Sequence, residues 1–460
     1  MNRTYVAALV LAPALGLLLA PALGLLPPRR AAAAEAPSSA PHPLTDVVSD
    51  DAAEDEETSE GFVLPASAEI APPLVFMGYV DVGFAAAEGN GTSYPPGDTR
   101  LPADYGVDTF APAVNSRGDV ASNSAGPLFV NGFLPRSVQI AGHPSFLLNT
   151  VNFDTRYQST RAPIMAFTRM QLLPRWEKGQ GNRTAIVVDQ AFGRVTPISG
   201  HEFFVSAGKF DSVFGIEYLD NQANFRTGVT PSLFARYTTG TSVGLKAFYR
   251  HQFAPLWSAL SLNTAATNSG NFIEALQPPD VSLTGRPVVS ARLGYELNLP
   301  FMQVKLGGSG LYGPRNDQGD RRAKQKMWGA DARLSVAGVS LSGEWVDVRE
   351  DLGGGGKETG QGSFPIASLF KAHGFWAQGG YGWHAGIGPL TALTAYARYE
   401  QRHAEFEGFR PIKVARLTAG FRVDLWDSLL LKAEVLFNQE LDGAPKVDND
   451  VVTSSVIYTW

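Results

Sequence analysis

The sequence predicts an all-β protein, a transmembrane antiparallel up-and-down β-barrel of about 16 strands, with about 18 as the alternative. Two observations carry this prediction. Segments of roughly 9 to 14 residues alternate polar and apolar side chains, and no apolar run near the ~18 residues of a membrane helix follows Leu74. With 18% charged residues and a mean hydropathy of -0.07, the chain is too polar for a helical bundle, and its 11% aromatic content is too high for disorder.

The first 36 residues predict a secretory signal peptide. Arg3 gives a positive start, the run from Val6 to Leu26 is apolar, and small residues at 31–36 offer cleavage positions. An uncleaved membrane anchor is the alternative, but Pro13 and Pro21 would kink such a helix.

Residues 37–73 predict an acidic disordered linker rich in Pro, Ser and Ala, with a partner-binding tail as the alternative. Residues 1–73 hold three basic and ten acidic side chains, whereas the remainder holds 35 basic and 34 acidic ones. This balance offers no basic surface for nucleic acid. We expect the barrel to occupy 74–460, with the N-terminal tail in the periplasm.

The segment Arg416–Leu425 shows the alternation clearly. Arg416, Arg422 and Asp424 fall on one face, and Leu417 and Phe421 fall on the other. A half-buried soluble sheet would alternate too. Full charges on one face, Ala, Gly and Leu with terminal aromatics on the other, and the length of the segments favour a wall with lipid outside. Because lipid leaves no backbone polar group unpaired, such strands must close into a barrel.

The connections alternate between tight turns and long polar or Gly-rich loops, which is typical of outer-membrane barrels. Counting every candidate segment gives seventeen strands, which include 230–239 and 256–264. A tight turn is expected at Thr239-Gly240, directly after the first of these two. An even number keeps both termini on one side of the membrane. We therefore assign 256–264 to the preceding strand or loop, which leaves sixteen. The first loop, 88–145, has room for a gate or plug.

Strands with a clear phase place eleven basic and six acidic residues on the inward face, where we predict that they line a pore. They are Arg236, Lys246, Arg250, Arg292, Glu296, Lys305, Asp331, Arg333, Glu344, Arg398, Glu400, Arg402, Arg416, Arg422, Asp424, Lys432 and Glu434. The basic excess predicts a modest anion preference at low salt. The alternative is a neutral lattice of cross-strand ion pairs.

Motifs that suggest chemistry are incomplete. The chain has no cysteine, which excludes disulfides and thiolate chemistry. The Gly-rich stretch 353–359 lacks Ser or Thr after Lys357, and 448–450 lacks the Gly and distal Glu of a calcium loop. The seven His residues are scattered, and His384 is better explained as an interfacial residue beside aromatics than as a base. We expect no catalytic residue, metal or cofactor.

The chain ends VVTSSVIYTW, with Val456, Tyr458 and Trp460 on one face. This ending resembles the final strand of Gram-negative outer-membrane porins, whose terminal aromatic residue is the signal read by the barrel-assembly machinery. The stretch Ala207–Arg250, with Gly215-Ile216-Glu217, an Asn-bearing loop and an expected hairpin, resembles the OmpL-like β-barrel porin family.

The resemblance implies a location in the outer membrane of a Gram-negative bacterium, in contact with lipid and lipopolysaccharide. It also implies passive diffusion of small hydrophilic solutes, with a homotrimer as one possible assembly. Three functions stay open at this point. They are a water-filled diffusion porin, a gated or substrate-selective channel, and a structural or adhesive barrel with a blocked lumen.

Overall fold

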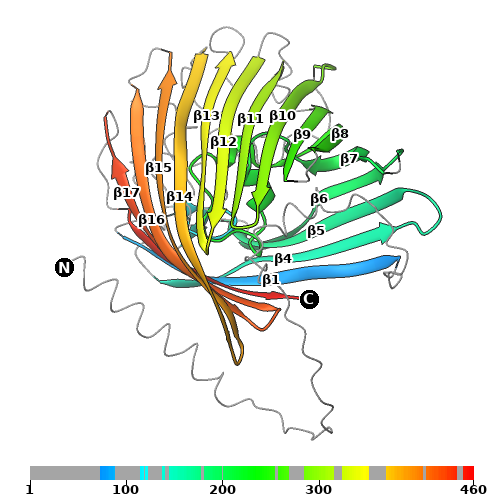
Figure 1. The fold of residues 1–460 in the computed structure, drawn as a ribbon. Helices are drawn as coiled ribbons and strands as arrows, with labels where there is room; N and C mark the ends of the chain where they lie inside the picture. The colour runs from blue at the N-terminus through cyan, green and yellow to red at the C-terminus, as the bar shows by residue number, and fades with distance from the viewer. Residues whose placement is uncertain are drawn as a thin grey trace, which may run out of the picture. The chain divides into compact units, whose positions relative to one another are not determined.

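The computed structural model contains a closed barrel of sixteen antiparallel strands, so the predicted fold class and strand number are confirmed (Figure 1). The structure describes residues 73–88, 114–118, 120–122, 137–139, 144–177, 181–198, 200–253, 257–268, 284–314, 324–351, 369–407, 411–442 and 449–460. The predicted signal peptide, the linker at 37–72 and most of the loop 88–145 lie outside these residues. No helix among the described residues is long and apolar enough to cross a membrane.

The barrel strands follow one another around the wall in chain order, and β1 closes the ring by pairing with both β4 and β18. They are β1 (Leu74–Ala87), β4 (Ser145–Gln158), β5 (Ile164–Glu177), β6 (Gly181–Val195), β7 (Glu202–Asp211), β8 (Thr241–Phe253), β9 (Ser258–Thr267), β10 (Val288–Leu299), β11 (Met302–Pro314), β12 (Lys324–Val336), β13 (Val339–Asp351), β14 (Leu369–Ile387), β15 (Leu390–Phe406), β16 (Ile412–Leu425), β17 (Leu429–Glu440) and β18 (Val451–Thr459). The short strands β2 (Val120–Ser122) and β3 (Ser137–Gln139) form a separate parallel pair.

The two faces of the wall differ as the alternation predicts. Large apolar side chains stand exposed on the outer face, for example Phe146 at 81% and Ile186 at 72% exposure. Charged side chains such as Arg398, Glu400 and Arg416 are buried on the inner face. An apolar outer surface is stable only against an apolar solvent, so this wall is built to stand in a lipid bilayer.

Tight turns join the strands at one end of the barrel, as predicted. Two of them place a non-glycine residue in the left-handed region, Ala337 at φ 48° and Trp426 at φ 49°. In each turn this conformation reverses the chain within a few residues. The turn at Pro300-Phe301 joins β10 to β11 in the same way.

The predicted number of strands is right, but two of the predicted strand assignments were wrong. Residues 230–239 do not form a strand, because they lie inside the barrel and contain the short helix α4 (Ala235–Thr238). Thr239-Gly240 is therefore not a hairpin turn. The candidate 256–264, which the parity argument had assigned to the preceding strand or loop, overlaps β9 (Ser258–Thr267), which pairs with β8 and β10. The two errors cancel in the count.

The last strand seals the barrel against β1. The backbone of Trp460 exchanges two hydrogen bonds with Gly78, with N···O distances of 3.1 and 3.2 Å. A Cβ atom at Gly78 would lie 2.5 Å from the Trp460 ring, so only glycine leaves room for it. The Trp460 ring also packs against Phe153 and Tyr458, with centroids 5.9 and 6.3 Å apart.

Because Trp460 closes the seam between first and last strands, we expect Trp460→Ala to lower the amount of folded, heat-modifiable barrel in the outer membrane without changing export across the inner membrane. Trp328→Ala removes a similarly exposed ring from the outer face of β12, and its barrel yield should stay near that of the parent. Equal yields for both variants would contradict an assembly role for Trp460.

Candidate functional site

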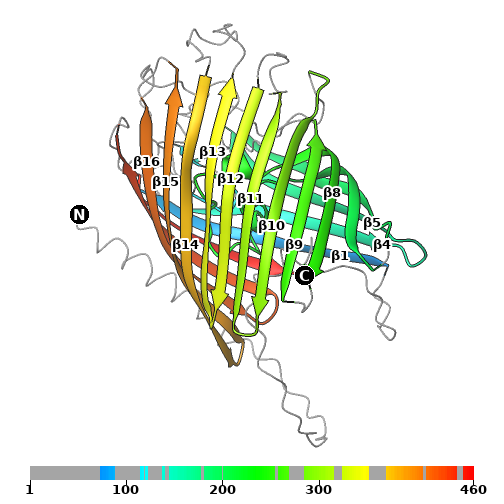
Figure 2. The same cartoon turned by 45° about the horizontal axis from the view of Figure 1, so that its top comes forward.

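A segment of the chain folds into the barrel instead of continuing the wall. We define residues 212–240, between β7 and β8, as the inward segment. It contains the 3-10 helix η1 (Glu217–Asp220) and the helix α4, and both lie within the ring of strands (Figure 2). Its backbone makes hydrogen bonds to side chains on strands far from its own ends, as described below, so it crosses the lumen.

Apolar packing explains why the segment turns inward. Phe214 and Phe234 are fully buried in the cluster that the segment forms with the opposite wall. Each ring sits over a wall glycine: a Cβ at Gly329 would lie 2.9 Å from Phe214, and one at Gly374 would lie 2.6 Å from Phe234. Burying two Phe side chains is worth about 1.5–3 kcal/mol each. The wall glycines thus form two sockets for the segment.

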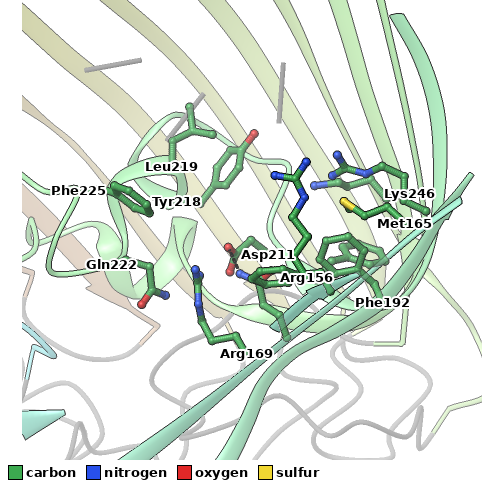
Figure 3. Close-up of a pocket in the computed structure, with 14 residues that line it drawn as sticks. Arg156, Met165, Arg169, Phe192, Asp211, Tyr218, Leu219, Gln222, Phe225 and Lys246 are labelled. Carbon is green, nitrogen blue, oxygen red and sulfur yellow. Dashed lines mark hydrogen bonds between the residues drawn. The ribbon is translucent and has the colours of Figure 1, made fainter. Parts of the chain in front are cut away.

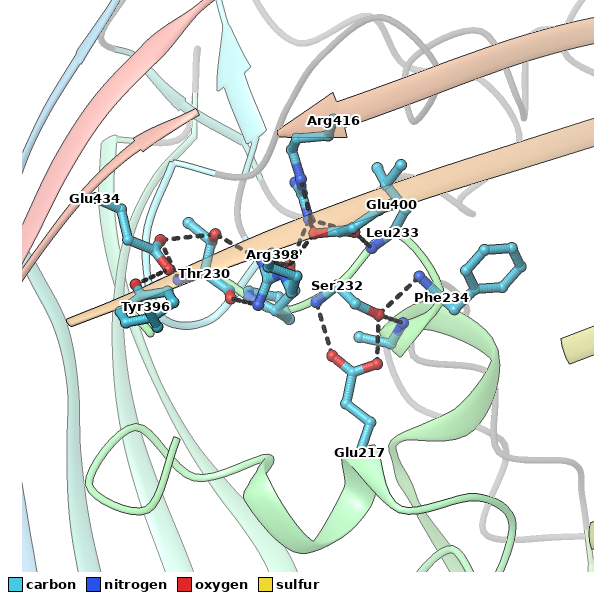
Figure 4. A network of polar contacts seen from close by, with 12 residues as sticks. Glu217, Thr230, Ser232, Leu233, Phe234, Tyr396, Arg398, Glu400, Arg416 and Glu434 are labelled. Carbon is cyan, nitrogen blue, oxygen red and sulfur yellow. Dashed lines mark hydrogen bonds and ion pairs between the residues drawn. The ribbon is translucent and has the colours of Figure 1, made fainter. Parts of the chain in front are cut away.

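The wall holds one end of the segment through buried charges on β15 and β16 (Figure 4). Glu400 accepts a hydrogen bond from the Leu233 amide at 2.6 Å and is paired with both Arg398 and Arg416. The two arginines also donate to backbone carbonyls of the segment, Arg398 to Thr230 at 3.0 Å and Arg416 to Pro231 at 2.6 Å. Buried charges are stable only when they are paired and hydrogen-bonded in this way.

A second group of anchors lies on β15 and β17. Glu434 accepts hydrogen bonds from the amide and hydroxyl of Thr230, both at 2.8 Å, and from the Tyr396 hydroxyl. The buried Lys432 ammonium donates to the carbonyls of Ala223, Arg226 and Gly228. Three backbone carbonyls satisfy all three donors of the ammonium group.

The opposite end of the segment is held by β12 and β13. Arg333 donates to the Ile216 carbonyl at 3.3 Å and pairs with Asp220 at 2.6 Å. Glu344 accepts from the Ile216 amide at 3.4 Å. Gly215 adopts φ +72°, and a Cβ there would collide with Glu344, so both its conformation and its surroundings require glycine.

Contacts within the segment stiffen it further. Glu217 accepts hydrogen bonds from the amide and hydroxyl of Ser232, which ties η1 to the start of α4. Burial raises the pKa of the Glu217 carboxyl, while the Ser232 hydrogen bonds to its charged form oppose that shift. Burial likewise lowers the pKa of the Arg226 guanidinium, which donates to the Val229 carbonyl at 3.0 Å and the Asn221 carbonyl at 2.8 Å.

Residues 114–118 of the first long connection also lie inside the barrel. Arg226 donates to the Ser116 carbonyl at 2.8 Å, and the Ser116 hydroxyl donates to buried Asp81 on β1. Thr453 on β18 donates to the Val114 carbonyl at 2.6 Å. This part of the expected gate or plug region therefore packs against the inward segment and the β1–β18 seam.

An opening remains on the other side of the lumen (Figure 3). We define the opening as the pocket between the inward segment and β4–β8. It is lined by Arg156, Met165, Phe167, Arg169, Gln190, Phe192, Arg194, Phe210, Asp211, Tyr218, Leu219, Gln222, Phe225 and Lys246. Four of these side chains are basic and one is acidic.

The structure separates the predicted pore-lining residues into groups. Nine of them touch the inward segment, namely Arg333, Glu344, Arg398, Glu400, Arg402, Arg416, Arg422, Lys432 and Glu434. Four others pair with each other on the wall, Arg250 with Glu296 and Arg292 with Asp331, and Asp424 pairs with Arg422. Lys305 lies between Glu296 and Arg333 in the strand register.

Of the predicted set, Lys246 lines the opening. The strand position given to Arg236 was wrong, because this residue lies on α4.

Three basic residues at the opening were missed: Arg156, Arg169 and Arg194. Bulges are one reason, because the register skips Asn149 in β4 and Asp189 in β6 and shifts the inward phase by one residue. Inward aromatic side chains are another, since Phe167 and Phe192 make both faces of β5 and β6 look apolar. The sequence did contain a signal for two of these basic residues, because Arg169 and Arg194 each follow an inward Phe by two positions.

Because wall charges bind the inward segment, we expect their substitution to release the segment from the wall. We expect Glu400→Ala to leave Arg398 and Arg416 without their shared partner and to free the segment, since breaking a buried pair costs about 3–5 kcal/mol. Protease cleavage within 212–240 should increase, and single-channel current should become noisier. Glu405→Ala removes an exposed acid from the same strand and serves as control. Equal cleavage in both variants would contradict the anchoring role.

Comparisons with known proteins find similar folds. No family model matches the chain, and no curated protein matches it, so membership of the OmpL-like family stays a resemblance. Among solved structures, the chain is similar to an anion-selective porin from Comamonas acidovorans (10% identity, 84% of this chain and 99% of that one, TM-score 0.48). It is also similar to the outer membrane channel DcaP of Acinetobacter baumannii (10% identity, 84% and 97%, TM-score 0.47) and to outer-membrane expressed OmpT of Vibrio cholerae (11% identity, 86% and 100%, TM-score 0.45). At these identities and scores the likeness carries no argument about function.

Proposed function

We propose that this chain forms a water-filled channel in the outer membrane of a Gram-negative bacterium, through which small hydrophilic solutes and ions diffuse passively. One observation carries the proposal. The inward segment crosses the lumen and is fixed to the wall on one side, while the opening is left on the other. A barrel of about 16 strands is wide enough to leave such an aqueous path.

The surfaces of the barrel support the proposed location. The exposed apolar outer face suits lipid, and tight turns at one end suit the periplasmic side of an exported barrel. β1 begins at that same end, which agrees with a tail in the periplasm. Val456, Tyr458 and Trp460 share the outer face of β18, where an assembly machinery could contact them.

The inward segment acts as a fixed constriction in this proposal. Its anchors come from five strands on one side of the wall, β12–β13 and β15–β17, so no single bond controls its position. A gated channel is the second candidate, and residues 114–118 favour it, because they are a separate piece of chain in the lumen that touches the segment at Arg226.

The ion preference rests on different residues from those that the alternation singled out. Most of the predicted inward charges are tied to the inward segment or paired on the wall. The opening itself is lined by Arg156, Arg169, Arg194 and Lys246 and by the acid Asp211, and Arg169 is paired with Asp154 on β4 at 2.7 Å. Charged groups at a constriction bias permeation, so we propose a modest preference for anions.

Planar bilayers with the purified protein test the channel. We expect discrete, long-lived conductance steps, and their absence would contradict the channel and leave a structural or adhesive barrel.

The reversal potential in a KCl gradient tests the ion preference. At about 0.1 M salt, where charges act over ~10 Å, the parent should favour chloride, and Lys246→Glu should shift the potential towards cation preference. Lys326→Glu makes the same charge change on an exposed side chain of β12 and should leave the potential unchanged. A parent channel that clearly prefers potassium, or equal shifts in the two variants, would contradict the assignment.

A further inference from the structure

The wall of the opening combines aromatic rings with basic groups in a repeated arrangement. Phe167 and Arg169 occupy successive inward positions on β5, and Phe192 and Arg194 do so on β6. Each guanidinium lies over the ring of its own strand, at 5.3 Å for Arg169 and 5.5 Å for Arg194. The two rings pack against each other with centroids 5.5 Å apart.

The arrangement continues onto the neighbouring strands. Arg194 also lies 3.9 Å from the ring centroid of Phe204 on β7, and the Lys246 ammonium lies 5.6 Å from that of Phe210. Inward aromatic side chains are unexpected on a wall that faces water. Here Phe167 and Phe192 pack together, Phe192 also packs against the cluster that contains Phe210, and we call these three side chains the Phe strip.

The inward segment presents a matching surface on the other side of the opening. Tyr218, Leu219 and Phe225 line it there, together with the Gln222 amide (Figure 3). Tyr218 and Leu219 belong to η1, which Arg333 and Glu344 hold in place. A solute in the opening therefore meets aromatic side chains on two sides and basic side chains on one.

We propose that the opening selects solutes that join a flat aromatic ring to a carboxylate, an inference that rests on the proposed channel function. The ring stacks between the Phe strip and the aromatic side chains of the inward segment, where aromatic pairs add to simple burial. The carboxylate lies beside Arg194 and Lys246, and arginine recognises planar carboxylates through its fork of donors.

The two contributions separate solute classes. A small aliphatic anion such as acetate gains only the attraction of the basic groups, and a neutral aromatic alcohol gains only the stacking. An aromatic carboxylate gains both. Because the ring contacts are shared among several side chains, each contact is weak, and the solute can leave the opening as well as enter it.

Bi-ionic reversal potentials with the full-length protein in planar bilayers test this inference. Sodium acetate, benzoate and cyclohexanecarboxylate are compared in turn against sodium chloride. Benzoate is larger than acetate, so diffusion through a featureless pore would rank it lower. We expect the reverse order, with benzoate also ahead of the non-planar cyclohexanecarboxylate. An order that follows size alone would overturn the inference, while the conductance itself would leave the channel proposal standing.

Two ring variants locate the effect. Phe192→Leu on the wall and Phe225→Leu on the inward segment each keep an apolar side chain but remove a ring. Each should lower the benzoate-to-acetate permeability ratio about two- to tenfold, the range that a single aromatic pair supports, while the acetate-to-chloride ratio stays constant. Parallel falls in both ratios would show a change of pore size and contradict selection by stacking.

A charge variant and a control complete the design. Arg194→Gln should lower acetate and benzoate permeability relative to sodium together. Arg349→Gln removes a cation from an exposed position at the far end of β13 and should change neither. Heat-modifiable migration and a measurable chloride current establish that each variant is folded and open. A parent protein that gives no current at all contradicts both the channel and the inference.

Discussion

The structure depends on the pairing between buried charges of the wall and the backbone of residues 212–240. Arg398, Glu400 and Arg416 would be costly on the inner face of a barrel without partners, and the inward segment would expose amides and carbonyls in the lumen if it stood alone. The wall charges and the backbone of the segment form hydrogen bonds with each other, at donor–acceptor distances of 2.6 to 3.0 Å. The same contacts close one side of the lumen, so the wall's electrostatics determine where the opening lies.

Glycine has a complementary part in this arrangement. The sockets at Gly329 and Gly374 receive Phe214 and Phe234, and Gly307 leaves room for the Arg292–Asp331 pair to reach from β10 to β12 across β11. The inner face of the wall thus combines charged side chains that bind the inward segment with glycines that leave room for neighbouring side chains. In the proposed channel, the inward segment fills one side of the lumen and the other side is lined by basic and aromatic side chains.

The sequence predicts the barrel well because lipid on one face and polar surroundings on the other enforce a period of two, as Arg416–Leu425 shows. It predicts the site poorly for physical reasons. Residues 230–239 lie inside the lumen and not in the wall, so an alternation of polar and apolar residues there does not distinguish a lipid face from an inner face. Bulges at Asn149 and Asp189 reverse the phase within a strand, which hid Arg156 and Arg194. Charges that the pattern placed in a pore, such as Glu434 and Lys432, bind the inward segment instead.

In the proposed channel, solutes pass between the inward segment and β4–β8, and accessibility to thiol reagents tests this path most directly. The chain has no cysteine, so each introduced thiol is unique. Met165 and Met170 lie on the same strand, Met165 in the opening and Met170 exposed on the outer face. A bulky, charged thiol reagent should reduce the single-channel current of Met165→Cys and leave that of Met170→Cys unchanged. An unaltered current after complete modification of Met165→Cys would contradict the account, because the path would then lie elsewhere in the barrel.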